Sequence, residues 1–224
     1  MRNAFDIGDY FLEQLARSYE IREADLGSDG LLKKKGMVFR THAYEIVGLG
    51  HFSVIRMDAM LGMMQMQTAV LSTFLKDIPL FNSDRVRAFG KETHLAELYD
   101  VQLTPYPEEY LKAFDRLKQN DSDISDYVSG SAHWYDEILY PCSYGKTGRH
   151  ISERVTGTMK AYIETFLSQA ASAPDCDEAL KKRKIDEFVR TLFSQGGPAV
   201  DKVRKLFGEE TAKRLIVNHM YGIC

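Results

Sequence analysis

The stretch that most constrains the fold runs from about residue 37 to residue 101, where strand-like segments follow one another with very short connections. β-Branched and aromatic residues recur there with the alternation of half-buried strands, and glycines interrupt them at positions 48, 50 and 62. We expect five strands, at about 37–46, 51–60, 63–74, 85–90 and 93–101. Connections this short join antiparallel neighbours, so the stretch predicts an antiparallel meander.

Helical spacing of apolar residues replaces strand alternation on both sides of the meander. One amphipathic helix is expected at 4–21, and further helices follow the meander at 108–119, 151–171, 173–195, 199–208 and 209–221. Segregated strands and helices are typical of α+β proteins. We therefore predict a three-layer α/β/α sandwich with a central antiparallel sheet. Since no repeat or long linker divides the sequence, residues 1–224 are expected to form a single domain.

Composition argues against several classes of function. The formal net charge of −3 gives no global attraction to nucleic acid. No apolar run reaches the roughly 18–20 residues that a membrane span needs, so we expect neither a nucleic-acid partner nor a membrane partner. Cys142, Cys176 and Cys224 form no CxxC pair, which supports neither a disulfide framework nor a zinc site. A reducing cytoplasm is the expected compartment.

Motifs of common enzyme classes are absent or stand in the wrong context. The glycines of GLGHFS (48–53) lie between two expected strands, whereas a dinucleotide fingerprint needs a helix after its glycines. Neither a GxSxG elbow nor an HExxH zinc motif occurs. His42 and Glu45 are three residues apart on a strand and should point to opposite faces, which argues against a shared metal. No metal site is predicted.

One short stretch, IPLFNSD (78–84), resembles the apolar-Pro-x-Phe-x-x-Asp stretch of the ferredoxin-dependent bilin reductases, in which the aspartate opens a strand. Two later segments resemble the family in the same order, ELYDVQLTP (97–105) and VRKLFGEETAKRLIVNHMYG (203–222). The first helix also has the character of the family, so the resemblance covers nearly the whole chain. The family fold is an α/β/α sandwich with a central antiparallel sheet, as periodicity predicts here.

The resemblance implies an oxidoreductase that acts on the CH–CH group of a linear tetrapyrrole such as biliverdin. Enzymes of this family bind no metal or flavin and take electrons one at a time from reduced ferredoxin, while the protein supplies protons. The implied partners are a biliverdin-like bilin and ferredoxin, and the implied state is a cytoplasmic monomer. Two alternatives stay open: a tetrapyrrole-binding or carrier protein without reductase activity, and an unrelated α+β interaction protein.

Catalytic residues are carried over from the family by position. Asp84 falls on the catalytic aspartate, and a carboxylic acid whose pKa is raised by burial can protonate a reduced substrate. Gln67 falls, by counting along the preceding strand, where members have a proton-relaying His or an Asn, although glutamine cannot release a proton. Asp58 is a second candidate proton donor. Gln67, Asp84 and Asp58 are expected to converge on one pocket.

Substrate-binding residues are expected to be mainly cationic, because the propionates of a bilin are anionic. Arg56 shares a strand face with Asp58 and should hold a carboxylate or depress the pKa of that aspartate. Lys146 and Arg149 lie in SYGKTGR, near basic positions of the family. Asp201 follows the position, here Gly196–Pro198, where some members have an aspartate. Basic runs at 33–35, 181–184 and 202–204 are candidate surfaces for an acidic ferredoxin.

Overall fold

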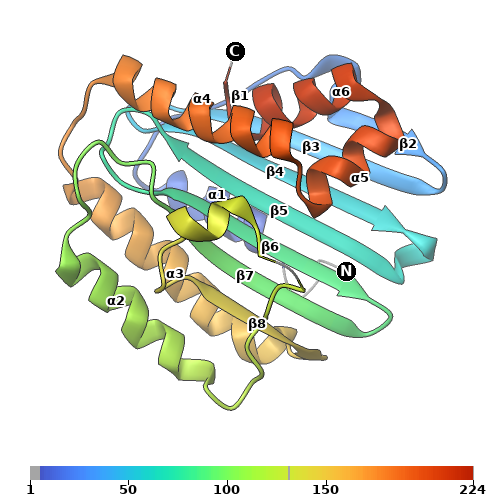
Figure 1. Ribbon diagram of the computed structural model, residues 1–224, viewed down its shortest axis with the longest axis horizontal. Helices are drawn as coiled ribbons and strands as arrows, with labels where there is room; N and C mark the ends of the chain where they lie inside the picture. The colour runs from blue at the N-terminus through green and yellow to red at the C-terminus, as the bar shows by residue number, and fades with distance from the viewer. Residues whose placement is uncertain (1–5, 131, 224) are drawn as a thin grey trace.

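Eight strands form one antiparallel sheet in the computed structural model, which describes residues 6–130 and 132–223 (Figure 1). The strands are β1 (Ile21–Glu23), β2 (Leu31–Lys34), β3 (Met37–Ile46), β4 (Gly50–Ala59), β5 (Met64–Thr73), β6 (Leu80–Ala88), β7 (Lys91–Tyr99) and β8 (Tyr144–Arg149). They lie in the order β1-β3-β4-β5-β6-β7-β8, with β2 also paired to β3. Neighbours in the sheet from β3 to β7 are neighbours in sequence, so the predicted meander is confirmed.

Among the described residues, one α-helix precedes the meander and five follow it. The α-helices are α1 (Ile7–Leu15), α2 (Glu108–Lys118), α3 (Ser152–Ser172), α4 (Glu178–Gln195), α5 (Pro198–Phe207) and α6 (Glu209–Lys213). A π-helix, η5 (Arg214–Met220), continues α6. Short 3-10 turns are η1 (Gly27–Gly30), η2 (Met60–Gly62), η3 (Gln119–Asp121) and η4 (Trp134–Ile138).

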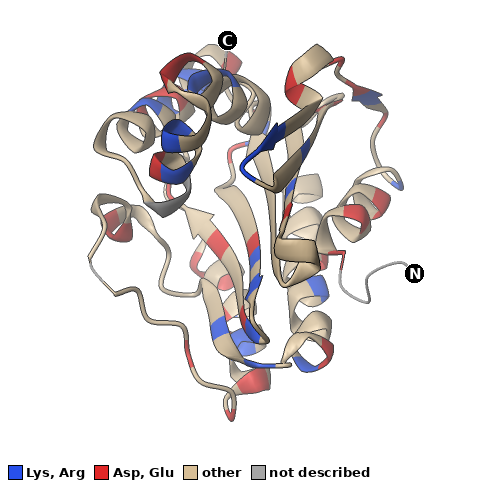
Figure 2. Ribbon diagram, turned by 90° about the vertical axis from the view of Figure 1, so that its right-hand side faces the viewer, with Lys and Arg blue, Asp and Glu red and all other residues tan. Residues whose placement is uncertain are grey.

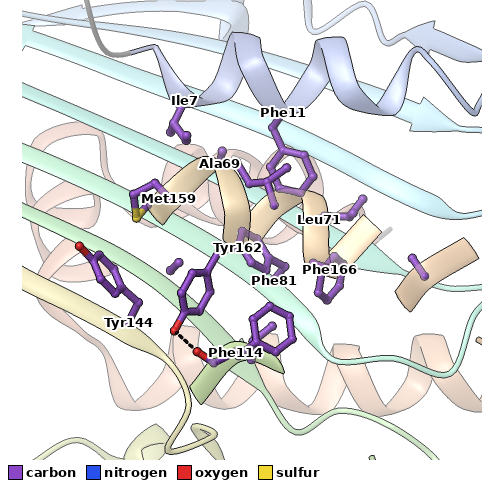
Figure 3. Close-up of a cluster of buried hydrophobic side chains, with 14 of the residues drawn as sticks. Ile7, Phe11, Ala69, Leu71, Phe81, Phe114, Tyr144, Met159, Tyr162 and Phe166 are labelled. Carbon is purple, nitrogen blue, oxygen red and sulfur yellow. Dashed lines mark hydrogen bonds between the residues drawn. The ribbon is translucent and has the colours of Figure 1, made fainter. Parts of the chain in front are cut away.

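The helices divide between the two faces of the sheet (Figure 1), which confirms the expected α/β/α layers. One face, called here the α3 face, packs against α1 and α3, and α2 packs against α3. At its centre, the ring of Phe81 lies 5.4 Å from that of Phe11 and 5.0 Å from that of Phe166 (Figure 3). The other face, called the α4 face, packs against α4, α5, α6 and η5.

Several element boundaries differ from those expected. β6 begins at Leu80 rather than near residue 85. Its first half was not predicted because Asn82, Ser83 and Asp84 have low strand propensity. β8 was expected to be a loop, since its two glycines suggest a turn, and the short edge strands β1 and β2 were not foreseen. The helix expected at 4–21 is confined to α1 among the described residues, and its first two positions lie outside them, as does Cys224.

Candidate functional site

Asp84 lies in the middle of β6, not at the mouth of a strand, and its side chain belongs to the α4 face. Strand alternation sets this orientation, because Phe81 enters the core of the α3 face while Leu80 enters the core of the α4 face. Asn82 and Asp84 therefore point the same way as Leu80. Directly across the sheet, Asp84 is paired with Thr68 on β5 and with Leu95 on β7.

A second carboxyl lies beside Asp84 and is linked to it by an amide. The Nδ2 of Asn82 donates hydrogen bonds to Asp84 Oδ2 and to Glu97 Oε2, both at 2.8 Å. The hydroxyl of Thr68 donates to Asp84 Oδ1, and the hydroxyl of Tyr99 donates to Glu97 Oε2 at 3.0 Å. We call Asp84, Asn82 and Glu97 the carboxyl pair with its bridging amide.

The surroundings of this pair favour protonated carboxyls. Burial raises the pKa of Asp84 above its ordinary value, although hydrogen bonds from Thr68 and Asn82 oppose the shift. Burial, together with the neighbouring charge of Asp84, raises the pKa of Glu97 to about 7. Two adjacent carboxyls cannot both ionise without mutual repulsion, so the pair retains a proton near neutral pH. A group of this kind is suited to general acid catalysis.

Aromatic rings stand around the pair. The ring of Tyr99 lies 6.1 Å from that of Tyr135 and 5.2 Å from that of Phe188, which in turn lies 5.9 Å from Tyr221. Trp134 contacts the same cluster, with its ring 5.6 Å from those of Tyr135 and Phe188. These rings come from β7, η4, α4 and the segment after η5, so elements far apart in sequence build one aromatic wall.

The wall does not close the whole face. Beyond Asp84, away from α4, the side chains of Met66, Val86 and Leu95 are only partly covered. Both carboxyls are themselves half-buried rather than sealed. The α4 face thus combines an apolar strip, aromatic rings and two partly exposed protonatable groups, which are the usual components of a site for a flat organic ligand.

Asp201 lies at a neighbouring cavity rather than at the carboxyl pair. This cavity has a volume of about 430 Å³ and lies between the segment before η4 and the start of α5. Its lining residues are Ala132, His133, Trp134, Gln195, Gly196, Gly197 and Asp201. Trp134 lines this cavity and also belongs to the aromatic wall, so the cavity with Asp201 adjoins the wall. The Asp201 carboxylate itself forms an ion pair with Arg204 at 3.4 Å.

The segment after α6 is fixed to the sheet and carries Tyr221 into the aromatic wall. On β4, the His51 ring is hydrogen-bonded to the carbonyl of His219 at 2.8 Å, and the Ser53 hydroxyl donates to the carbonyl of Met220 at 2.8 Å. Asp29 of η1 also receives a two-point ion pair from Arg214 and contacts the His219 ring at 3.1 Å. Two separate parts of the chain thus hold this segment in place.

The expectation that Gln67 converges on a pocket with Asp84 is wrong. Gln67 precedes Thr68 on β5, and adjacent residues of a strand point to opposite faces, so its side chain lies on the α3 face. Its Oε1 accepts from the backbone N–H groups of Ile7 and Gly8 at 3.1 and 3.2 Å, and its Nε2 donates to Asp6 at 2.6 Å. Gln67 therefore caps the start of α1.

Arg56 and Asp58 share one face, as alternation predicted, but it is again the α3 face. Arg56 is occupied by a two-point ion pair with Asp6, at 2.8 and 2.9 Å. Asp58 lies near the end of β4, where it accepts from Arg40 at 3.0 Å and from Gln65 at 3.1 Å. Neither residue joins Asp84, and no shared pocket of Asp58, Gln67 and Asp84 exists.

The two cations expected on one loop are separated by strand alternation within β8. Lys146 pairs across the sheet with His94 on the α3 face, where its Nζ is buried against the carbonyl of Ile124 and the carboxylate of Asp126. Arg149 pairs with Lys91 and so belongs to the α4 face, where it is exposed at the end of the strand. Of the two, only Arg149 can approach a ligand on the Asp84 side.

Glu97 and Asn82 were not foreseen as site residues, although the sequence held a signal for both. Asn82 stands two positions before Asp84, so alternation alone puts the two on one face. Glu97 stands directly across from Asn82 in the register of β6 and β7. A polar residue at that position of a buried strand becomes informative only when the register is known.

The described parts of the chain contain neither a cluster of metal-ligating side chains nor a helix fit to span a membrane. Within residues 6–130 and 132–223, no group of three or more His, Cys, Asp or Glu side chains is arranged to hold a metal ion. No helix in the same residues is both long and apolar enough to cross a bilayer.

The whole fold is similar to that of a known protein. Phytochromobilin synthase from tomato, crystallised in complex with biliverdin, superposes with a TM-score of 0.75 at 13% sequence identity. The alignment covers 96% of this chain and 81% of that one. No protein-family model and no curated protein sequence matches the chain. Similarity at this level of identity concerns architecture, and this chain therefore has the α/β/α fold of phytochromobilin synthase.

Proposed function

We propose that this protein binds a linear tetrapyrrole of the biliverdin type on the α4 face and reduces it with electrons from ferredoxin. The observation that carries the proposal is the carboxyl pair with its bridging amide, on the half-open face of a sheet whose fold matches that of phytochromobilin synthase. Raised pKa values leave a proton on this pair near neutral pH, as a proton-donating site requires.

The proposed ligand fits the surfaces that flank the pair. A bilin is a long conjugated molecule, so it gains most from aromatic rings and an apolar strip, which the partly exposed Trp134, Tyr135 and Met66 supply. Its propionates need cations or water, and Arg149 is the cation of the expected set that stands on this face. The other two cations, Arg56 and Lys146, lie on the α3 face and take no part.

The proposed reaction adds two electrons and two protons to each double bond that is reduced. Ferredoxin supplies the electrons singly, and each transfer raises the basicity of the tetrapyrrole. Asp84 and Glu97 share an acidic proton, so the pair delivers one proton directly and the second proton after it has taken one up from solvent. Thr68, directly across from Asp84, carries a hydroxyl that does not titrate in this range, which leaves Glu97 as the second donor. Solvent then reprotonates the pair at the open side of the face.

The alternative is a tetrapyrrole carrier without reductase activity. It is favoured by Thr68 at the position facing Asp84, because a histidine there would be the stronger proton relay. The two functions share the same ligand and the same face, and they differ only in whether electrons and protons reach it.

Anaerobic spectroscopy separates these functions. Biliverdin added to the purified protein is expected to shift its visible bands, and reduced ferredoxin with its reductase is then expected to bleach or move them. Asp84→Asn and Glu97→Gln should bind the bilin but slow its reduction about 100-fold or more, the usual contribution of a general acid. Asp58→Asn, a carboxyl of the α3 face, is the matched control and should react at the rate of the unmodified protein.

Each result has a distinct meaning. Spectral binding without turnover in the unmodified protein would establish the carrier. Equal rates for all three variants would remove the carboxyl pair from the mechanism. Absence of any spectral change would exclude both functions.

A further inference from the structure

Three hairpin turns and the end of one further strand lie together at one end of the sheet. The pairing register runs straight across it through Lys34, Met37, Ala59, Met64, Ala88, Lys91 and Arg149. Just beyond this row lie the β2–β3 turn, the β4–β5 turn, the β6–β7 turn and the end of β8 (Figure 1). We call the exposed side chains of these segments the tip surface, namely Lys33, Lys34, Lys35, Met60, Leu61, Met63, Phe89, Lys91, Arg149 and His150.

The middle of the tip surface is apolar and projects into solvent. Leu61 is fully exposed, and Phe89, Met63 and Met60 are exposed by 60%, 51% and 48%. The backbone N–H of Phe89 donates to the carbonyl of Met63 at 3.1 Å, which ties the two central turns into one platform. Large apolar side chains grouped at protruding turns are unusual on a protein that meets only water.

The backbone of these turns does not explain the choice of residues. Among the described residues, every non-glycine residue with positive φ lies at this end: Lys35, Met60, Leu61, Phe89 and His150, with φ between 50° and 57°. Two-residue hairpin turns do require positive φ, but Asn, Asp or Gly meets that requirement with less strain. Leucine and phenylalanine are held there against conformational preference, and strain of this kind often marks a functional surface.

Cations flank the apolar centre on both sides. Lys33, Lys34 and Lys35 stand at the β2–β3 turn, and Lys91 and Arg149 stand at the far edge. None of these five forms an ion pair within the described part of the chain, and the segments 31–37, 60–63, 86–91 and 147–150 contain no Asp or Glu. Figure 2 looks onto this end, with Lys and Arg in blue. A protein of net charge −3 therefore carries a local positive surface here.

We propose that the tip surface docks the protein onto an anionic lipid bilayer. Leu61, Phe89 and their neighbouring methionines would enter the interfacial region, while the flanking lysines meet lipid phosphate and carboxylate groups. The shape favours a bilayer over a protein partner, because a protruding turn needs a complementary pocket on a protein but none in lipid. A protein bound in this way lies on the membrane surface and requires no spanning segment.

The expectation of no membrane partner rested on the absence of an apolar run. That criterion detects spans, whereas the tip surface is assembled from four segments, none with more than three exposed apolar side chains. The proposal goes beyond the proposed function and is independent of it, because vesicle binding is measured without substrate or electron donor.

Vesicle sedimentation tests the proposal with the full chain. Vesicles of phosphatidylcholine with phosphatidylserine are expected to sediment the protein, and vesicles of phosphatidylcholine alone should do so much more weakly. The double variant Leu61→Asp/Phe89→Asp should weaken binding by at least roughly tenfold, because it puts charge into the apolar centre. Lys33→Glu/Lys35→Glu should weaken it to a similar degree and abolish its dependence on salt.

The matched control is Leu180→Asp/Arg183→Glu on α4, which changes an exposed apolar residue and an exposed cation away from the tip surface. It should bind vesicles as the unmodified protein does. Thermal unfolding and biliverdin spectra of all variants verify that the fold and the Asp84 face persist. Failure of the unmodified protein to bind, or equal binding by the tip variants, overturns the proposal. So does a dimer that the tip variants abolish in the absence of vesicle binding, which would assign the surface to a second copy.

Discussion

Two glutamates five residues apart on β7 show how differently the faces of one sheet treat the same side chain. Glu92 lies on the α3 face, where the backbone N–H and hydroxyl of Ser152 donate to it at 2.8 Å and Arg87 donates at 2.7 Å. These donors lower its pKa to about 2, although burial opposes them. Glu97 lies on the α4 face beside Asp84, and its pKa rises to about 7. One face uses a carboxylate to hold a helix, and the other keeps a proton available.

The largest effect should come from the closed core of the α3 face. Phe81→Ala removes a ring packed between Phe11 and Phe166 and should lower the free energy of unfolding by about 3–5 kcal/mol. Val86→Ala, on the same strand but on the half-open face, should cost about 0.5 kcal/mol or less. Denaturant titration measures both, and equal losses would mean that the α4 face is as tightly packed as the α3 face.

The second effect is an opposite pH dependence for the two glutamates. Glu97 binds its proton more tightly when folded, so the stability it contributes is complete below its unfolded pKa of about 4.5 and is lost as pH rises toward 7. Glu92 has a lowered pKa, so its contribution is complete above about 4.5 and is lost as pH falls toward 2. Each change amounts to at most about 3 kcal/mol.

Variants of each glutamate isolate its contribution to stability. The stability of the unmodified protein minus that of Glu97→Gln should fall between pH 4.5 and pH 7, and the same difference for Glu92→Gln should fall from pH 4.5 down to pH 2. Unfolding curves across this range provide the measurement. If both stability differences changed in the same direction with pH, the contrast between the two faces would be contradicted.

The smallest effect concerns Gln67. Gln67→Ala removes the acceptor for the first N–H groups of α1 and should destabilise the protein by about 1–2 kcal/mol. Because the side chain lies on the α3 face, the proposed reduction of biliverdin should continue at the rate of the unmodified protein. Gln65→Ala, on the same strand and face but near the start of β5, should cost less. A loss of turnover without loss of stability would return Gln67 to the catalytic site.

Periodicity was enough to predict the architecture. The β3, β4 and β5 strands begin and end within one residue of the expected positions, because alternating apolar residues and glycine turns mark them clearly. The edge strand β8 was not predicted because the sequence GKTG is typical of a turn. Its conformation is decided by its pairing with β7. Long-range pairing of this kind is not encoded in any local pattern.

The site was predicted less well than the fold because a site depends on register. Gln67 and Thr68 are adjacent on β5, and on a strand one residue is the difference between opposite faces, so a count along the sequence does not place Gln67 beside Asp84. Asp84 was chosen as a candidate from a motif resemblance, without any count across strands. Glu97 has no motif, and only its alignment with Asn82 across β6 and β7 gives it a role. The basic run at 181–184 likewise contains a buried residue, Lys181, which bonds to the carbonyls of Ile78 and Val101.

The attachment of the segment around Tyr221 to β4 also sets an order of assembly during translation. All eight strands of the described residues precede this segment in the chain, so the whole sheet is synthesised before the carbonyl groups that His51 and Ser53 bind. Until α4 and Tyr221 emerge, the nascent chain displays the carboxyl pair on an uncovered apolar face. The face that carries the candidate site is thus covered only after the sheet has been synthesised, and the speed of synthesis determines how long this face stays exposed to chaperones and aggregation.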